Sequence, residues 1–188
     1  MHTLIITAHP SSKGFTHQIA LAFQRGRLAT AGNTVEILDL YKTDLKQDFL
    51  TFEDIKAMAP DPVRQIMQQK ILDANEIVFI HPLWWMGPPA ILKNWLDNNL
   101  AARFSYRYID GKPVGLLKGR TARVFITCDG PKYIYWLIAM PFAINWILGI
   151  LRFNGLRVAS FRLLDRKRFR SQEYLDAYTK KVENMART

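Results

Sequence analysis

The chain has 188 residues, enough for one domain (1–188) with a substantial core, and its 49% hydrophobic content excludes disorder as the main state. A formal net charge of +10 favours anionic partners, such as phosphorylated ligands, nucleic acid or a membrane surface. One cysteine, Cys128, excludes an internal disulfide framework; with an N-terminus that lacks signal-peptide features, it predicts a cytoplasmic protein.

Apolar strand-like runs alternate with helical patterns along the chain. Runs of β-branched and aromatic residues predict five strands, at 3–8, 34–38, 77–80, 121–127 and 156–161. Helical spacing, with Asp61-Pro62 and Ser171 as typical helix starts, predicts helices at 15–31, 61–74, 88–100 and 171–186. A long connection at 39–60, with one short helical turn, and an excursion at 103–118 interrupt the pattern. The alternation predicts an α/β fold with a five-stranded parallel sheet and helices on both faces.

The segment 133–151 is almost entirely apolar and approaches the roughly 20 residues of a membrane span. Pro141 lies near its middle and predicted strands flank the segment. These features favour a buried or dimer-facing helix that is kinked or split at Pro141. A true membrane span and an interfacial membrane contact are the alternatives.

The most informative stretch is 77–100. A short apolar run predicts a strand that is buried on both faces, His81-Pro82 ends this strand, and Pro88-Pro89 opens a helix. The loop between them carries large apolar side chains, Leu83, Trp84, Trp85 and Met86. The two tryptophans either cover the end of the core or form a flat wall for a planar aromatic ligand.

Three loops follow the first, third and fourth predicted strands, at 9–16, 81–87 and 127–131. In a sheet of order 2-1-3-4-5 these strands are neighbours, so their loops meet at the edge where open α/β sheets bind ligands. The first loop has small and hydroxyl residues before a helix, which suits a phosphate, and Lys13 adds charge. The alternative for Ser11 and Ser12 is ordinary helix capping.

Other chemistry-bearing residues carry weaker signals. Basic residues gather at 162–170, where a solvated loop is a commoner explanation than nucleic-acid binding, because no nucleic-acid module accompanies them. Four scattered histidines and one cysteine show no metal-ligand spacing, so we expect no metal site. No histidine is placed to activate Cys128, which favours a small buried residue over a nucleophile.

Three stretches carry a family resemblance. They are Ala8-His9-Pro10 with Gly14-Phe15-Thr16, then Asp39-Leu40-Tyr41, and then the run 82–95, which is the most specific. Across nearly the whole chain the sequence resembles the flavodoxin-like NAD(P)H:quinone oxidoreductases, which include mammalian quinone reductases and bacterial ancillary proteins of glutathione-gated potassium efflux. The resemblance implies a flavodoxin-like three-layer fold and a bound flavin.

The resemblance also implies roles for residues in the three loops. The residues that would bind the cofactor are His9, Gly14, Phe15 and Thr16 at the phosphate and ribityl chain, Pro82, Leu83, Trp84, Trp85 and Met86 along the ring, and Thr127, Cys128, Asp129 and Gly130 at its pyrimidine end. FMN is expected rather than FAD, because family members that bind FAD usually carry more C-terminal sequence.

A tyrosine assists hydride transfer in the mammalian members, and its position here is Tyr135, with Tyr133 as the alternative. The family's histidine six residues later is Pro141, and the paired glycines of the third loop are Asp129-Gly130. Tyr135 is therefore the catalytic candidate. Backbone amides at 128–130 would stabilise charge on the reduced flavin without a histidine, and we expect the Asp129 carboxylate to point away from the ring.

These observations predict an NAD(P)H dehydrogenase (quinone): a homodimer that binds FMN, uses NADH or NADPH, and reduces quinones by two-electron ping-pong transfer. No nucleic-acid partner is expected. The alternative is a regulatory subunit of a membrane transporter of the potassium-efflux type, with secondary oxidoreductase activity. The apolar segment and the positive charge would then serve peripheral membrane or transporter contact. An electron-carrier flavodoxin is disfavoured, because such carriers are typically acidic.

Overall fold

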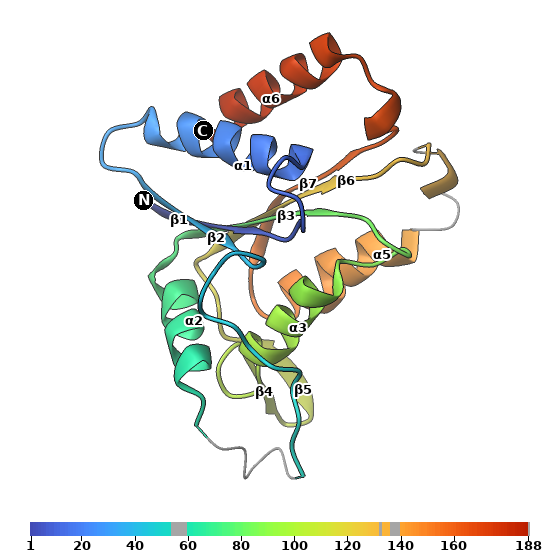
Figure 1. Cartoon of the computed structure of the whole chain (residues 1–188). Coiled ribbons are helices and arrows are strands. Elements are labelled where there is room, and N and C mark those ends of the chain that lie inside the picture. Colours follow the sequence, from blue (N-terminus) through green and yellow to red (C-terminus); the bar gives the residue numbers. More distant parts are fainter. Residues whose placement is uncertain (54–59, 132, 136–139, 188) are drawn as a thin grey trace.

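The computed structural model describes residues 1–53, 60–131, 133–135 and 140–187. Its main sheet has five parallel strands in the order β2-β1-β3-β6-β7 (Figure 1). The strands are β1 (His2–Thr7), β2 (Thr34–Asp39), β3 (Glu76–Pro82), β6 (Thr121–Thr127) and β7 (Arg157–Leu164). The predicted order 2-1-3-4-5 is confirmed, since β6 and β7 are the fourth and fifth strands of this sheet.

Helices cover both faces of the sheet, as predicted (Figure 1). One face carries α1 (Phe15–Leu28) and α6 (Gln172–Ala186), and the other carries α2 (Pro62–Asp73), α3 (Ala90–Asn99), α5 (Met140–Ile144) and the π-helix η2 (Asn145–Arg152). Successive residues of the central strands point into two different cores: Val78 and Ile80 pack toward α1 and α6, whereas Ile77 and Phe79 pack toward the opposite helices. The continuous apolar runs in the sequence reflect this burial on both faces.

Local chemistry sets the helix ends. The Asp61 carboxylate accepts a hydrogen bond from Val63 N at 2.9 Å, and Ser171 Oγ accepts one from Tyr174 N at 3.2 Å, so both predicted caps are confirmed. Helix α1 ends before the predicted residue 31. Asn33 Nδ2 donates to the Arg27 carbonyl at 3.0 Å and closes the helix early. Helix α3 starts after the proline pair that was predicted to open it.

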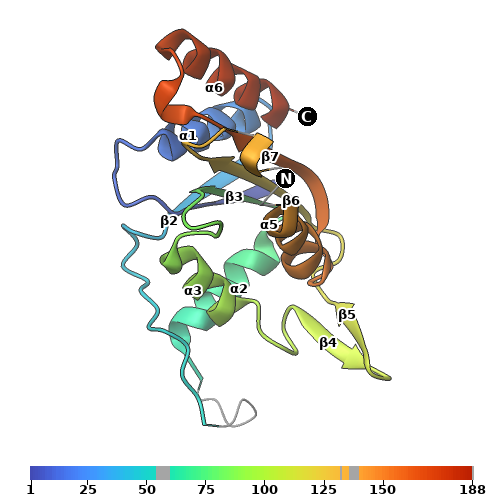
Figure 2. The ribbon, with the colours of Figure 1, turned by 90° about the vertical axis from the view of Figure 1, so that its right-hand side faces the viewer.

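The excursion at 103–118 folds as an antiparallel hairpin of β4 (Tyr106–Ile109) and β5 (Lys112–Gly115), which projects from the main sheet (Figure 2). Asp110 and Gly111, with φ of 50° and 74°, form its turn. The predicted connection at 39–60 shows no helix in its described part, 40–53. Residues 54–59 of the connection lie outside the described part of the chain, so a helical turn predicted there stays a prediction.

The apolar segment 133–151 is helical in its described parts, with η2 as a wide π-turn in which Phe153 N donates to the Leu148 carbonyl. Pro141 is the second residue of α5. The predicted kink or split at Pro141 borders residues 136–139, which lie outside the described part of the chain. Among the described residues, no helix is both long enough and apolar enough to cross a membrane.

Candidate functional site

The loops after β1, β3 and β6 meet at the carboxyl edge of the sheet because their strands are parallel neighbours. Backbone hydrogen bonds join the strand ends: Ala8 N donates to the Ile80 carbonyl at 3.1 Å, and Leu83 N to the Thr127 carbonyl at 2.8 Å. Together the loops enclose a pocket of about 480 Å³, which we call the loop pocket. It is lined by His9, Ser11, Lys13, Gly14, Phe15, Pro82, Leu83, Trp84, Thr127, Cys128, Asp129, Gly130, Tyr135, Lys167 and Arg168.

Most of the residues selected from the sequence line this pocket. Three do not. Thr16 is a buried residue in the first turn of α1, Trp85 is fully exposed, and Met86 packs against the core. Of the two candidate tyrosines, Tyr135 lines the pocket and Tyr133, which is 62% exposed, does not.

The first loop presents the start of α1 to the pocket. Gly14 is the N-cap and supplies no side-chain hydrogen bond, so the first-turn amides have no side-chain cap. A Cβ on Gly14 would clash with the His9 ring in its present position, so the loop approaches this ring closely because residue 14 is a glycine. Thr16 Oγ1 is buried and has no hydrogen-bond partner among the described residues. An uncapped helix start with an orphaned hydroxyl beside it suits a phosphate.

The second loop turns sharply between Trp84 and Gly87. Trp84 N donates to the Gly87 carbonyl at 3.0 Å, and Gly87 N to the Trp84 carbonyl at 2.9 Å. The two residues between them, Trp85 and Met86, have φ of 49° and 62°, in the left-handed region that favours glycine. The loop thus holds a fully exposed tryptophan on a strained turn, as is common at binding sites.

A buried histidine, His81, lies at the start of the second loop and contacts its backbone. His81 Nδ1–H donates to the Pro82 carbonyl at 2.8 Å, and its ring stacks on Trp146 of η2 with centroids 5.3 Å apart. Burial lowers the pKa of His81 to about 4, against the opposing effect of the hydrogen bond to Pro82. His81 is therefore neutral at pH 7 and fixes the Pro82 carbonyl.

The third loop is closed by Tyr135. A Cβ on Gly130 would lie 2.6 Å from the Tyr135 hydroxyl, which shows how closely the phenol approaches this backbone. Burial raises the pKa of Tyr135, and the neighbouring Cys128 raises it further, so the phenol is neutral at pH 7. Burial also raises the pKa of the Cys128 thiol to about 11. The interpretation of Cys128 as a small buried residue rather than a thiolate nucleophile agrees with this pKa.

A fourth loop, after β7, completes the pocket with two cations that the sequence analysis did not assign to it. Lys167 N donates to the Cys128 carbonyl at 2.9 Å, and Arg168 N to Asp129 Oδ1 at 3.2 Å. The Arg168 guanidinium also lies 3.2 Å from Asp129 Oδ2 and balances that carboxylate. The position of these residues after the fifth strand was the available signal, because parallel strands end at one edge.

Comparisons with known proteins agree with this architecture. A family model described as "Flavodoxin-like fold" matches residues 1–185. An "Uncharacterized NAD(P)H oxidoreductase" of Haemophilus influenzae is 33% identical over 169 residues, which cover 87% of this chain and 83% of that protein. The human "Ribosyldihydronicotinamide dehydrogenase [quinone]" is 26% identical over 181 residues, with coverage of 86% and 78%.

A solved structure shares the fold over nearly its full length. It is an FMN-dependent NADH-azoreductase from Bacillus anthracis in complex with FMN, with a TM-score of 0.79, 22% identity, and coverage of 98% of this chain and 97% of that one. At this identity the likeness concerns the fold alone.

Proposed function

This chain belongs to the flavodoxin-like family of NAD(P)H oxidoreductases, and from that membership we propose that it is a flavin-dependent enzyme that reduces quinones, or related electron-poor aromatics, with NADH or NADPH. The observation that carries the proposal is the loop pocket, where an uncapped helix start that suits a phosphate, large apolar side chains and the partly buried phenol of Tyr135 meet at one sheet edge. Such pockets at the switch point of a doubly wound sheet bind nucleotide cofactors.

FMN is the cofactor that the first loop fits best. The phosphate would bind at the start of α1, with Thr16 Oγ1 as a hydrogen-bond donor and Lys13 as a nearby charge. FMN ends in a phosphate monoester, which carries more charge on one group than the diester phosphates of FAD do, so a helix start favours it. That a protein of this fold from Bacillus anthracis binds FMN supports the choice.

When bound, the flavin would supply the redox chemistry, accepting a hydride from the nicotinamide and passing two electrons to the acceptor in ping-pong order. The protein's own groups would orient the reactants. Pro82, Leu83 and Trp84 form an apolar wall that excludes water. The Asp129 and Gly130 amides would donate hydrogen bonds to the ring, whereas the Cys128 amide, also expected to do so, donates to the Leu164 carbonyl at 2.9 Å. The neutral Tyr135 hydroxyl would hold a proton at the mouth of the pocket, so Tyr135 is the proposed catalytic residue.

The purified protein tests this proposal. It should be yellow, release FMN that mass spectrometry identifies, and bleach when titrated anaerobically with NADH or NADPH. Tyr135→Phe should keep the flavin and lose about tenfold or more in kcat with a quinone, whereas Tyr133→Phe should behave as wild type. A colourless protein that refuses added FMN and FAD would overturn the proposal.

The proposal includes a homodimer. Three half-exposed apolar side chains, Met140, Ile144 and Leu148, lie on α5 and η2. Covering them with a second copy would gain on the order of 25 cal/mol per Å² of apolar area. The second candidate function, regulation of a membrane transporter, would use the same face. Co-purification with membranes in moderate salt would favour that candidate.

A further inference from the structure

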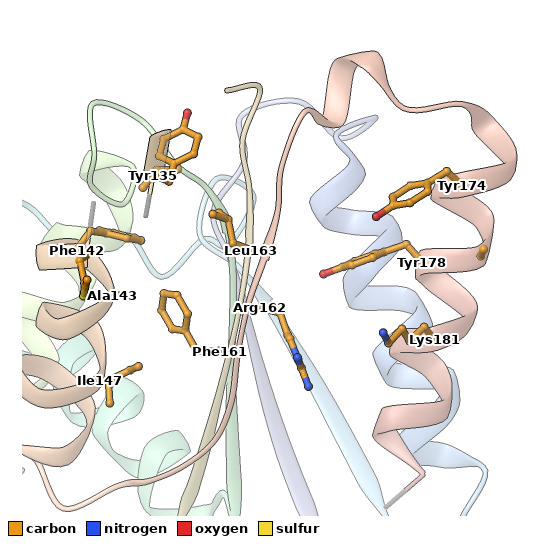
Figure 3. Close-up of a pocket in the computed structure, with 13 residues that line it drawn as sticks. Tyr135, Phe142, Ala143, Ile147, Phe161, Arg162, Leu163, Tyr174, Tyr178 and Lys181 are labelled. Atoms are coloured by element: carbon orange, nitrogen blue, oxygen red, sulfur yellow. The ribbon is translucent and has the colours of Figure 1, made fainter. Parts of the chain in front are cut away.

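A second and larger hollow lies at the free edge of the sheet. β7 is the last strand of the sheet order, and the hollow of about 730 Å³ wraps its outer edge between α5–η2 on one side and α6 on the other (Figure 3). We call it the edge hollow. It is lined by Leu83, Tyr135, Met140, Phe142, Ala143, Ile147, Phe161, Arg162, Leu163, Tyr174, Ala177, Tyr178 and Lys181.

The edge hollow has two chemically different walls, because successive side chains of a strand point to opposite faces. Phe161 points from β7 toward Phe142 and Ile147, and together they make an apolar wall on the α5–η2 side (Figure 3). Arg162 points to the other face, toward Tyr178 and Lys181 of α6 (Figure 3). An occupant of the whole hollow would therefore meet hydrocarbon at one end and cations at the other.

We call the α6 side of the hollow, with Arg162, Tyr174, Tyr178 and Lys181, the polar wall. Its polar groups are available to bind a ligand. Arg162 and Lys181 make no ion pair with a carboxylate within the described part of the chain. Tyr178 lies beside them in the lining of the hollow. Its hydroxyl is buried without a hydrogen-bond partner among the described residues, and Figure 3 shows it directed toward β7. Two exposed cations and an unpartnered phenol form a set of donors for an anion.

The edge hollow adjoins the loop pocket. Leu83 and Tyr135 line both, so a molecule whose reactive group lies at the loop pocket can extend along β7. Along α6 the hollow is lined from Tyr174 to Lys181, which is seven residues of helix, or about 10 Å. That span sets the length of the apolar body that would separate a reactive group from an acidic one.

We propose that the edge hollow binds an amphiphilic anion, whose apolar body lies against Phe161, Phe142 and Ile147 and whose carboxylate-like group is bound by Arg162, Lys181 and Tyr178. Because Leu83 and Tyr135 line both the loop pocket and the edge hollow, the favoured occupant is the acidic side arm of a quinone acceptor. That assignment rests on the proposed function. A free alkanoate also joins an apolar body to a carboxylate, and it is the alternative occupant.

Equilibrium binding tests the hollow independently of any reaction. Decanoate and decanol, which differ in the acidic group, are titrated into the full-length protein with its cofactor bound, and binding is followed by calorimetry. We expect decanoate to bind about tenfold more tightly, as a charge-assisted hydrogen bond provides. The double variant Arg162→Met/Lys181→Met should lose this preference, and Lys180→Met, on the same helix but outside the hollow, should keep it. Equal binding of the two compounds, or an unchanged double variant, would overturn the proposal.

A matched quinone series tests whether the occupant is the side arm of a quinone acceptor or a free alkanoate. One benzoquinone ring carries no chain, a decyl chain, or a decyl chain with a terminal carboxylate. We expect the carboxylate compound to have a KM about tenfold below that of the decyl compound at equal kcat, and the double variant to abolish the difference. Equal KM values, with decanoate still bound, would overturn the acceptor-arm assignment and leave the free alkanoate. Failure to reduce even the chainless quinone would count against the proposed function and leave the binding result standing.

Discussion

At the scale of single residues, the backbone is strained at Trp85 and Met86, in the loop whose residues Pro82, Leu83 and Trp84 line the proposed site. Both residues have positive φ, where Asn-Gly would be the unstrained choice. We predict that Trp85→Asn/Met86→Gly raises the free energy of unfolding by about 2–4 kcal/mol, because each of the two left-handed non-glycine residues costs about 1–2 kcal/mol. The same variant should bind FMN or the acceptor more weakly. Urea unfolding and flavin titration measure the two effects, and a less stable variant would contradict the strain argument.

His81 should make stability depend on pH. Its pKa is about 4 in the folded chain and ordinarily about 6.5, so between these values the unfolded chain binds a proton that the folded chain excludes. The stabilisation is complete above pH 6.5 and is lost as the pH falls toward 4. It amounts to about 3 kcal/mol over this window.

The variant His81→Phe removes this titration while keeping a ring to stack on Trp146. Urea unfolding at pH 7.0 and 4.5 should show a fall in stability that is about 2 kcal/mol larger for the wild type than for the variant. If the free energy of unfolding changed equally with pH in the two proteins, the pKa of His81 would be the same in the folded and the unfolded chain, and the prediction would be wrong. At pH 7 the variant should also lose affinity for FMN, because the Pro82 carbonyl is no longer held.

At the scale of elements, a buried ion group joins α1, β3 and β6. Glu76 accepts from Arg27 Nη2 at 2.6 Å and from Arg123 Nε at 2.8 Å, and the Arg27 and Glu76 side chains are almost fully buried. This group lies at the amino end of β3, opposite the loop pocket. The ion group therefore holds the packed elements together and takes no part in the proposed reaction.

Removing one member of this group should be costly. We predict that Arg27→Met lowers the free energy of unfolding by about 3 kcal/mol, because it leaves a buried carboxylate with one partner fewer. Arg25→Met is the matched control: its ion pair with Glu183 is much more exposed than the pair of Arg27 and Glu76, so it should contribute much less to stability. Both variants should keep FMN binding, measured by flavin fluorescence. Equal losses of stability in the two would refute the role of burial.

At the scale of the whole molecule, the exposed face of α5 and η2 predicts self-association. Leu148→Glu would place a charge on the same exposed face as Met140 and Ile144, and we expect it to convert a dimer into a monomer in sedimentation velocity at micromolar concentration. Leu21→Glu, at a residue of similar exposure on α1 and the opposite face of the sheet, should leave the dimer intact. A wild-type monomer under these conditions would exclude the homodimer.

Much of the fold and of the site could be predicted from the sequence, because the relevant signals are local. Apolar runs and helical spacing located the five strands and the helices on both faces, and Asp61 and Ser171 marked helix starts correctly. The three loops could be assigned to one edge because the order of parallel strands determines which strand ends are neighbours. Each of these features depends on a few consecutive residues.

Only the tertiary structure decided the features that join distant parts of the chain. It brought Lys167 and Arg168 onto the third loop, excluded Tyr133, Trp85 and Met86 from the pocket lining, and formed the edge hollow between α5–η2 and α6. The sequence by itself determined the elements and the edge at which the site forms, since periodicity and turn chemistry act within a segment. The identity of the lining residues depended on packing between segments, because a side chain's surroundings are set by whichever residues the fold brings beside it.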